Sequence, residues 1–263
     1  MTTTTDNTTT TTATKPLTDH AKYWLEKVSR FASADPHRYV LTYPFICPKT
    51  GAIVATDTHR LIVVPGIADP SNGGSCTKEG GNLGHLGTYP NFERVIPDPA
   101  DLSFITLAEK DAERLLVALQ ALTKGEVSKM GNQRMTLTIG AGQLAGTIAH
   151  ADVSVTIGPF PCEGMAEGKI AFNHVYLRES LEMFLIPRKN HVAAAPIKIG
   201  LNTKRNTYEI EPCRPITIES PEVPEVIEVK PENGTGWKPG RPYRPASPAK
   251  IVVMPMALNK VDA

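Results

Sequence analysis

A repeated alternation of one amphipathic helix with several short strands is the feature that most restricts the fold of this 263-residue chain. Apolar residues at helical spacing predict helices over about 19–34, 108–123 and 173–185. Each predicted helix is followed by short apolar runs separated by Gly, Asn, Asp and Pro residues, which is typical of antiparallel meanders. The second and third helices are also preceded by the strand candidates SFITL and KIAF.

These elements group into three units, at about 16–66, 101–158 and 168–219. The repetition is one of pattern rather than of residue identity, and it predicts the α+β fold class. The strand candidates that follow the helices are RYVLTYPFI, AIVATD and RLIVVP, then RMTLTIG, QLAGTIAH and DVSVTIG, and finally PIKIGLN, TYEIEP and RPITIES.

Three segments do not fit the repeating pattern. The Thr-rich residues 1–15 bury too little apolar surface to offset the entropy of ordering, so we expect a disordered tail. The Gly-rich stretch 66–88 predicts a loop or linker, and the Pro-rich stretch 220–249 predicts an extended or disordered insertion. The run KIVVMPMAL after this insertion predicts a strand that pairs back into the preceding sheet.

Composition and the lack of known motifs argue against several classes of function. The 28 basic and 27 acidic residues leave a formal charge of +1, so any basic surface must arise by local segregation of charge. The four cysteines form no C-x-x-C pair, and the seven histidines show no metal-ligand spacing. The sequence also has no P-loop, no G-x-S-x-G motif and no apolar run of the ~20 residues that a membrane span needs. We therefore expect a protein without cofactor, metal or active site.

The most informative residues lie in three short segments that are far apart in the chain. They are ATDTHRL (55–61), YPNFERVIP (89–97) and VVMPMAL (252–258). The last of these places Met beside β-branched residues, and flexible Met side chains suit a surface that accepts varied apolar partners. The alternative for this segment is an ordinary strand that is buried in the core.

In this order the three segments resemble the bacterial sliding clamp, the beta subunit of DNA polymerase III. HRYVLTYPF and IAFNHVYLRESLEM are similar to two further segments of that family. The resemblance covers about residues 17–258 and implies the DNA-clamp fold of repeated β-α-β-β-β units. It also implies a cytoplasmic homo-oligomeric ring, with helices toward double-stranded DNA and sheets outside. Such a processivity factor is no enzyme, needs no cofactor, and binds the replicative polymerase and the clamp loader through short peptide motifs.

The resemblance assigns a client-peptide pocket and a DNA-facing surface. Two residues depart from the family pattern: Thr58 stands where the family has Gly, and Ala257 stands where it has Arg. An apolar groove would take the client's Leu and Phe side chains, while Arg60 or Arg94 would fix its orientation. The implied pocket residues are Leu41, Thr56, Thr58, His59, Arg60, Leu61, Pro90, Arg94, Val95, Val252, Val253, Met254, Pro255, Met256 and Leu258.

The DNA-facing residues are basic side chains on or near the predicted helices, where loose phosphate contacts would let a ring slide. For each of them the alternative is a solvated helix face without function. The candidates are Lys22, Lys27, Arg30, Arg38, Tyr39, Lys110, Arg114 and Arg178, with Arg188 and Lys189 after the third helix.

The chain is shorter than a three-domain clamp, so the resemblance implies an unusual domain organisation. We expect a tail at 1–15, part of a middle domain at 16–66, a linker at 67–89 and a C-terminal domain at 90–258 with the insertion at 220–249. Two alternatives to a processivity factor stay open: a clamp-like decoy or adaptor that binds peptides without forming a ring, and an enzyme on a related fold.

Overall fold

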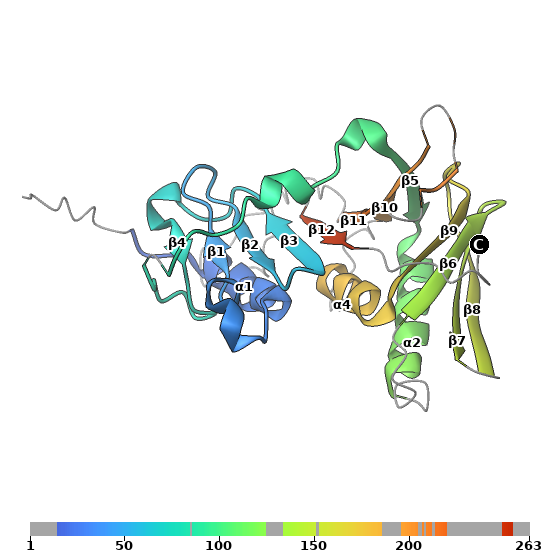
Figure 1. The fold of residues 1–263 in the computed structure, drawn as a ribbon, viewed down its shortest axis with the longest axis horizontal. Helices are drawn as coiled ribbons and strands as arrows, with labels where there is room; N and C mark the ends of the chain where they lie inside the picture. Colours follow the sequence, from blue (N-terminus) through green and yellow to red (C-terminus); the bar gives the residue numbers. More distant parts are fainter. Residues whose placement is uncertain are drawn as a thin grey trace, which may run out of the picture.

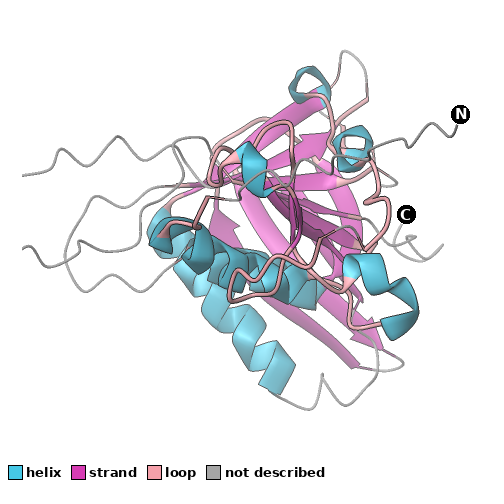
Figure 2. Ribbon diagram, turned by 90° about the vertical axis from the view of Figure 1, so that its left-hand side faces the viewer, coloured by secondary structure: helices cyan, strands magenta, loops and turns pink. Residues whose placement is uncertain are grey.

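The computed structural model describes residues 15–84, 86–124, 134–150, 153–185, 196–204, 207, 209–211, 214–219 and 249–254. The Thr-rich residues 1–14 and most of the Pro-rich stretch, residues 220–248, lie outside the described residues. Two antiparallel sheets form one layer, and three α-helices pack along one face of this layer (Figures 1 and 2).

Capping residues set the start of two of the three helices, and the spacing of apolar residues sets the face that each helix buries. They are α1 (Asp19–Val28), α2 (Glu109–Lys124) and α4 (His174–Phe184). The Thr18 side chain caps α1 and the Asn173 side chain caps α4, each accepting a hydrogen bond from a backbone N–H of the first turn. Apolar residues at helical spacing, such as Leu115 and Leu119, are buried against the sheets, so the helices form in the three predicted regions.

The larger sheet has eight strands, which come from the first part and the last part of the described chain. Its neighbouring strands are antiparallel, and the order places the C-terminal strand in the middle. The order is β4 (Gly74–Ser75), β1 (Phe45–Ile46), β2 (Ile53–Thr56), β3 (Arg60–Val64), β12 (Lys250–Val253), β11 (Ile216–Glu219), β10 (Ile197–Asn202) and β5 (Leu102–Leu107).

The smaller sheet has four strands. Its order is β8 (Val153–Pro161), β7 (Gln143–His150), β6 (Arg134–Gly140) and β9 (Gly168–Asn173). The second and third of the predicted units exchange the strands that precede their helices. Strand β5 precedes α2 but pairs with β10 of the next unit, whereas β9 precedes α4 but pairs with β6. This exchange joins the second and third units into one structure with a common core.

One strand prediction in the first unit is wrong in its first half. The run RYVLTYPFI contributes to a 3-10 helix, η2 (Pro36–Leu41), and only Phe45–Ile46 at its end forms a strand. Pro36 lies at the start of η2 and the Asp35 side chain accepts a hydrogen bond from the His37 N–H, so local capping outweighs the strand propensity of the run. The first helix also ends earlier than predicted and continues as the 3-10 helix η1 (Ser29–Phe31).

A second correction concerns the third unit. Among its described residues, TYEIEP makes only isolated bridges, Thr203 with Ile210 and Glu167 with Glu209. The third strand after α4 is instead β12, which follows the Pro-rich stretch. The prediction that this last strand pairs back into the preceding sheet is confirmed, since β12 pairs with β11.

The predicted linker lies partly against α1, since Gly80 packs beside Leu25 and Cys76 belongs to the core on the helix side. The stretch 66–88 contains the 3-10 helix η3 (Pro70–Asn72) and the two-residue strand β4. Two further 3-10 helices follow, η4 (Phe92–Val95) and η5 (Pro99–Asp101), before β5 begins. The eight-stranded sheet crosses the proposed boundary between residues 16–66 and 90–258, so the two parts share one sheet.

Close packing between β5, β10 and β11 yields a test of this arrangement. A Cβ atom at Gly200 would lie 2.3 Å from the Thr217 Oγ1 and 2.9 Å from the Phe104 ring. We expect Gly200→Ala to lower the free energy of unfolding by about 2 kcal/mol, because an overpacked core must shift. Gly140→Ala is the matched control, since a Cβ atom added there would meet no neighbouring atom within 4 Å. Urea denaturation of both variants measures the difference, and equal stability would contradict the packing described.

Candidate functional site

Pairing between β3 and β12 brings two of the three informative segments together. Leu61 lies opposite Val252 and Arg60 lies opposite Val253. Beyond the strand, the Met254 N–H donates a hydrogen bond to the His59 carbonyl at 2.9 Å. Segment 55–61 and residues 252–254 of the last segment are therefore neighbours in space, although most of the chain separates them in sequence.

The third segment covers the outer face of the same strands. The Tyr89 ring stacks on the Phe45 ring with centroids 4.5 Å apart, and burial raises the pKa of the Tyr89 hydroxyl. Phe92 and Ile96 pack with Tyr89 against a small apolar cluster. The buried members of this cluster are Cys47, Ala52, Val54, Leu61 and Val252. The structure thus brings all three segments to one place.

Two exposed apolar side chains mark the surface above this cluster. Val95 is 45% exposed and Met254 is 39% exposed, whereas most large apolar side chains of the described residues are buried. Pro90 and Arg94 are also exposed, and they lie next to Tyr89 and Val95 in the chain. The exposed and described members of the client-peptide pocket that the resemblance implies are named the client surface, and they are Thr58, His59, Pro90, Arg94, Val95 and Met254.

The other predicted pocket residues are buried, half-buried or outside the described residues. Leu41, Leu61, Val252 and Val253 are buried and Thr56 is half-buried. Val253 points into the core on the helix side, while Val252 belongs to the outer cluster. Pro255, Met256, Ala257 and Leu258 lie outside the described residues.

A tight turn between β2 and β3 forms one side of the client surface. The Asp57 Oδ1 accepts hydrogen bonds from the backbone N–H groups of His59 and Arg60, each at 2.9 Å. The Thr56 hydroxyl donates to the Arg60 carbonyl and accepts from the Thr58 N–H. Thr58 adopts a φ of +79°, a region that favours Gly, so its backbone explains why Gly suits this position in the clamp pattern.

Arg60 faces the interior of the molecule. Its guanidinium donates to the Asp57 Oδ2 at 3.0 Å, to the Glu179 carboxylate, and to the Arg30 carbonyl at 3.0 Å. The same group lies 4.7 Å from the centre of the Phe31 ring and 4.9 Å from that of Tyr176. Arg60 is only 9% exposed. It therefore joins β3 to α4, and of the two arginines considered for client orientation only Arg94 is exposed.

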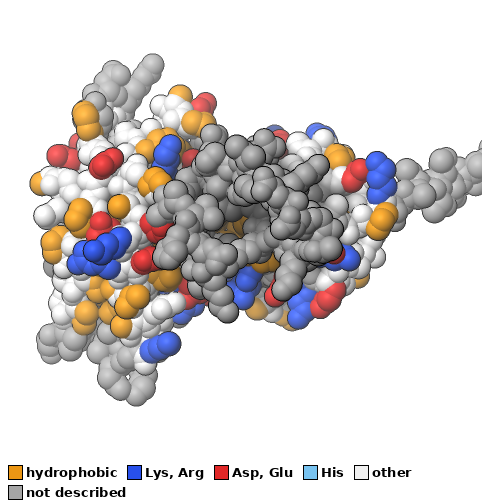
Figure 3. Space-filling model, turned by 180° about the vertical axis from the view of Figure 1, so that it is seen from behind, with side chains coloured by type: hydrophobic (Ala, Val, Ile, Leu, Met, Phe, Trp, Pro, Cys, Tyr) orange, Lys and Arg blue, Asp and Glu red, His pale blue; other side chains and the backbone are white. Residues whose placement is uncertain are grey.

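The helix side of the molecule holds the predicted DNA-facing residues, but its charges nearly balance. Helix α1 has two basic and two acidic side chains, α2 has three of each, and α4 has one basic and two acidic. Basic and acidic groups are also interleaved on the face seen in Figure 3. The described helices thus offer no net positive charge to a phosphate backbone.

Several of the predicted DNA-facing cations have carboxylate neighbours within the molecule. Arg178 is half-buried and pairs with Glu179 at 3.0 Å and with Glu182 at 3.6 Å. Arg114 pairs with Asp111 at 3.0 Å and Lys22 lies 3.9 Å from Asp19. Lys110 and Arg30 are exposed, and half-buried Lys27 lies over the Tyr23 ring. Arg188 and Lys189 lie outside the described residues.

Arg38 and Tyr39 lie apart from the three helices, on η2 beside the β2–β3 turn. The Arg38 guanidinium donates to the Thr58 hydroxyl at 2.6 Å and lies 3.5 Å from an Asp35 oxygen. Tyr39 is exposed. Sequence reasoning assigned these residues to DNA and did not foresee that Arg38 also contacts the client surface.

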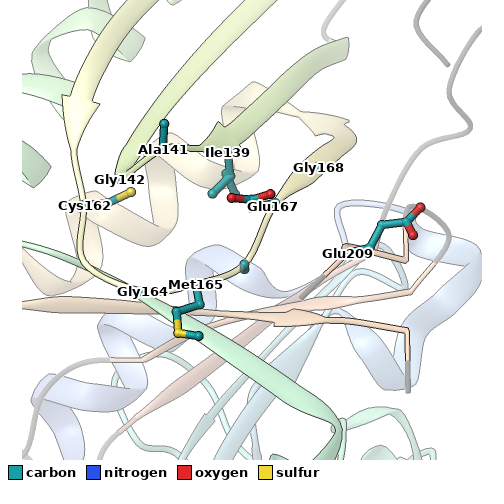
Figure 4. Close-up of a pocket in the computed structure, with 10 residues that line it drawn as sticks. Ile139, Ala141, Gly142, Cys162, Gly164, Met165, Glu167, Gly168 and Glu209 are labelled. Atoms are coloured by element: carbon teal, nitrogen blue, oxygen red, sulfur yellow. The ribbon is translucent and has the colours of Figure 1, made fainter. Parts of the chain in front are cut away.

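A cavity of about 670 Å³ lies at the other end of the molecule, where β6 turns into β7 and β8 leads into β9 (Figure 4). Ile139, Cys162 and Met165 supply apolar lining, and Glu167 and Glu209 supply carboxylates. The Glu209 carboxylate pairs with Lys204 at 2.5 Å. No sequence motif pointed to this cavity. Its lining glycines Gly142, Gly164 and Gly168 all have positive φ and mark the sharp turns that shape it.

Two kinds of feature are absent from the described part of the chain. There, no cluster of three or more His, Cys, Asp or Glu side chains is placed to hold a metal ion. No described helix combines the length and apolar character that crossing a membrane requires.

Comparison with known proteins identifies the fold. No family model and no curated protein matches the chain. Solved structures do match. A DnaN sliding clamp from Bartonella birtlesii bound to griselimycin superposes with a TM-score of 0.58 at 17% identity, covering 90% of this chain and 63% of that one. The DNA polymerase III beta subunit from Thermotoga maritima gives a TM-score of 0.59 at 14% identity, with 96% and 69% covered.

The chain has the fold of a bacterial sliding clamp. The beta subunit of Streptococcus pyogenes DNA polymerase agrees, with a TM-score of 0.57 at 15% identity and coverage of 95% and 69%. The predicted clamp fold is thereby confirmed. The chain spans 63% of the length of the Bartonella birtlesii clamp.

The contacts of Arg60, which join β3 to α4, can be tested by measuring the free energy of unfolding. Removing Arg60 takes the cation away from the half-buried Asp57 carboxylate and leaves Glu179 with Arg178 alone, so Arg60→Ala should lower the free energy of unfolding by about 3 kcal/mol. Arg30→Ala is the control, since only the Arg30 carbonyl takes part and that carbonyl is kept. Guanidinium denaturation compares the two, and a loss below ~1 kcal/mol for Arg60→Ala would refute the structural role.

Proposed function

We propose that this protein is a sliding clamp, a processivity factor that encircles duplex DNA and tethers replication proteins through the client surface. The observation that carries the proposal is the convergence of residues 55–61, 89–97 and 252–254 at one exposed surface of a clamp fold. The same segments resemble segments of the clamp family. The replicative polymerase and the clamp loader in the cytoplasm are the proposed clients.

The chemistry of the client surface suits a short peptide with apolar side chains. Val95 and Met254 offer exposed apolar groups above a firmly packed base of Leu61 and Val252. A Met side chain adapts to partners of different shape, which favours a surface that serves several clients. Arg94 at the edge supplies a charged donor for a carbonyl or carboxylate of the peptide.

A ring requires more than one copy of this chain, and two features support a homo-oligomer. Strand β8 is at the end of its sheet, so one of its edges lacks a partner within the described chain. Helix α2 packs against β8 and carries Val117, whose side chain is 65% exposed. An open strand edge beside an exposed apolar side chain favours pairing with a strand of another copy.

The nearly balanced charge of the helices supports loose rather than tight contact with DNA. Phosphate contacts carry no sequence information, and their strength rises with the number of phosphates neutralised. A protein that slides needs few of them. The same observation favours the second candidate, a clamp-like decoy or adaptor that binds clients without encircling DNA.

The client surface is tested with griselimycin, which occupies the related Bartonella birtlesii clamp. We expect Val95→Ala combined with Met254→Ala to weaken griselimycin binding at least tenfold, because each truncation removes apolar contact area worth about 1 kcal/mol. Met165→Ala is the matched control, since Met165 is exposed but lines the distant cavity. Isothermal titration calorimetry measures the affinities, and unchanged binding by the double variant would remove the assignment.

The ring is tested by light scattering. We expect the wild-type chain to form an oligomer, and Ser154→Lys with Thr156→Lys to shift it toward monomer, because charged residues on an edge strand oppose pairing. Both residues are exposed on β8. Thr138→Lys on β6, an exposed position of an inner strand, should leave the mass unchanged. A wild-type monomer that still binds griselimycin would favour the adaptor.

A further inference from the structure

The Arg38 guanidinium holds the turn that forms one side of the client surface. It donates to the Thr58 hydroxyl at 2.6 Å and, more weakly, to the Asp57 carbonyl at 3.4 Å. The carboxylate of Asp35, from the residue that caps η2, lies 3.5 Å from the Arg38 Nε. The Arg38 side chain is 46% exposed, so one part of the guanidinium faces solvent while another part is bound to the turn.

The Thr58 side chain is the part of the turn that this contact holds. Thr58 has a φ of +79°, which β-branched residues rarely adopt. Its N–H is bound by the Thr56 hydroxyl, and the neighbouring N–H groups are bound by Asp57. Within the described residues, the Thr58 hydroxyl itself has one hydrogen-bond partner, Arg38. Loss of that partner removes the interaction that holds the Thr58 side chain in place.

Displacement of the turn would reach the client surface directly. The His59 carbonyl accepts a hydrogen bond from the Met254 N–H, and the His59 ring stacks on Tyr176 with centroids 6.4 Å apart. Thr58 and His59 belong to the client surface themselves. The turn therefore links Arg38 on one side to Met254 on the other.

We propose that Arg38 is a positioning residue shared by two binding events: it orders the turn for a client peptide, and it is drawn away from the turn by a DNA phosphate. The inference rests on the proposed function. Arg38 is the one residue among the DNA-facing candidates whose side chain contacts the client surface in the described structure. A phosphate oxygen binds guanidinium more strongly than a neutral hydroxyl does, so phosphate and Thr58 compete for the same group.

The competition makes DNA binding and client binding oppose each other. Because linkage is reciprocal, bound duplex weakens client binding by the same factor by which a bound client weakens duplex binding. We expect a factor of about five, at the lower end of usual coupling, since the phosphate must displace only one strong hydrogen bond. Such coupling would favour release of a client from a clamp that is in close contact with DNA.

The test measures griselimycin affinity by calorimetry, with and without a saturating short DNA duplex at low ionic strength. Fluorescence anisotropy of the labelled duplex verifies saturation and measures the reciprocal effect. In the wild-type protein the duplex should weaken griselimycin binding about fivefold. Arg38→Ala and Thr58→Ala should bind griselimycin more weakly and lose the effect of the duplex. Thr58→Ser should retain it, because Ser keeps the hydroxyl that accepts from Arg38.

Thr58→Ala separates positioning from charge, since it leaves the Arg38 cation available to DNA. Arg214→Ala serves as the control, because Arg214 is an exposed cation that pairs with Glu211 away from the turn. Equal griselimycin affinity with and without bound duplex in the wild-type protein would overturn the inference and leave the proposed function standing. Failure of the duplex to bind would overturn both the inference and the ring, and failure of griselimycin to bind would overturn the client surface.

Discussion

Four residue pairs between β3 and β12 support most of the architecture. This pairing makes one eight-stranded sheet from the two ends of the chain. Because side chains alternate along a strand, Ile251 and Val253 enter the core under the helices while Val252 enters the outer cluster under the linker. The same short strand therefore completes the core, supports the client surface and places Met254 beside His59. A change that removed β12 would dismantle all three.

On the helix side of the same pair of strands, Arg60 connects β3 to α4. A nearly buried guanidinium is costly unless its donors are satisfied, and here two carboxylates, one carbonyl and two aromatic rings surround it. From Glu179 the polar contacts continue through Arg178 and Glu182 to Gln120 on α2. These charged groups of α2 and α4 thus contact one another within the helix layer.

The proposed function follows from shape and surface rather than from reactive groups. A protein that surrounds its substrate needs a closed path, weak contacts on the inside and a place for partners. The nearly balanced helices, the open edge of β8 and the exposed apolar client surface fit those requirements. Arg38 is relevant both to partner binding and to contact with DNA, because it contacts the client surface and is also partly exposed to solvent.

The sequence by itself determined the three helices, most of the strands and the α+β class, because helical and strand periodicities are local properties. Its short motifs also indicated the clamp fold. Only the tertiary structure decided that RYVL forms a 3-10 helix, that β12 rather than TYEIEP completes the third unit, and that β5 and β9 exchange sheets. It also decided that Arg60 points inward and Arg38 toward Thr58. These outcomes depend on contacts between residues distant in sequence, and local pattern carries no information about which distant partner a strand or a guanidinium will find.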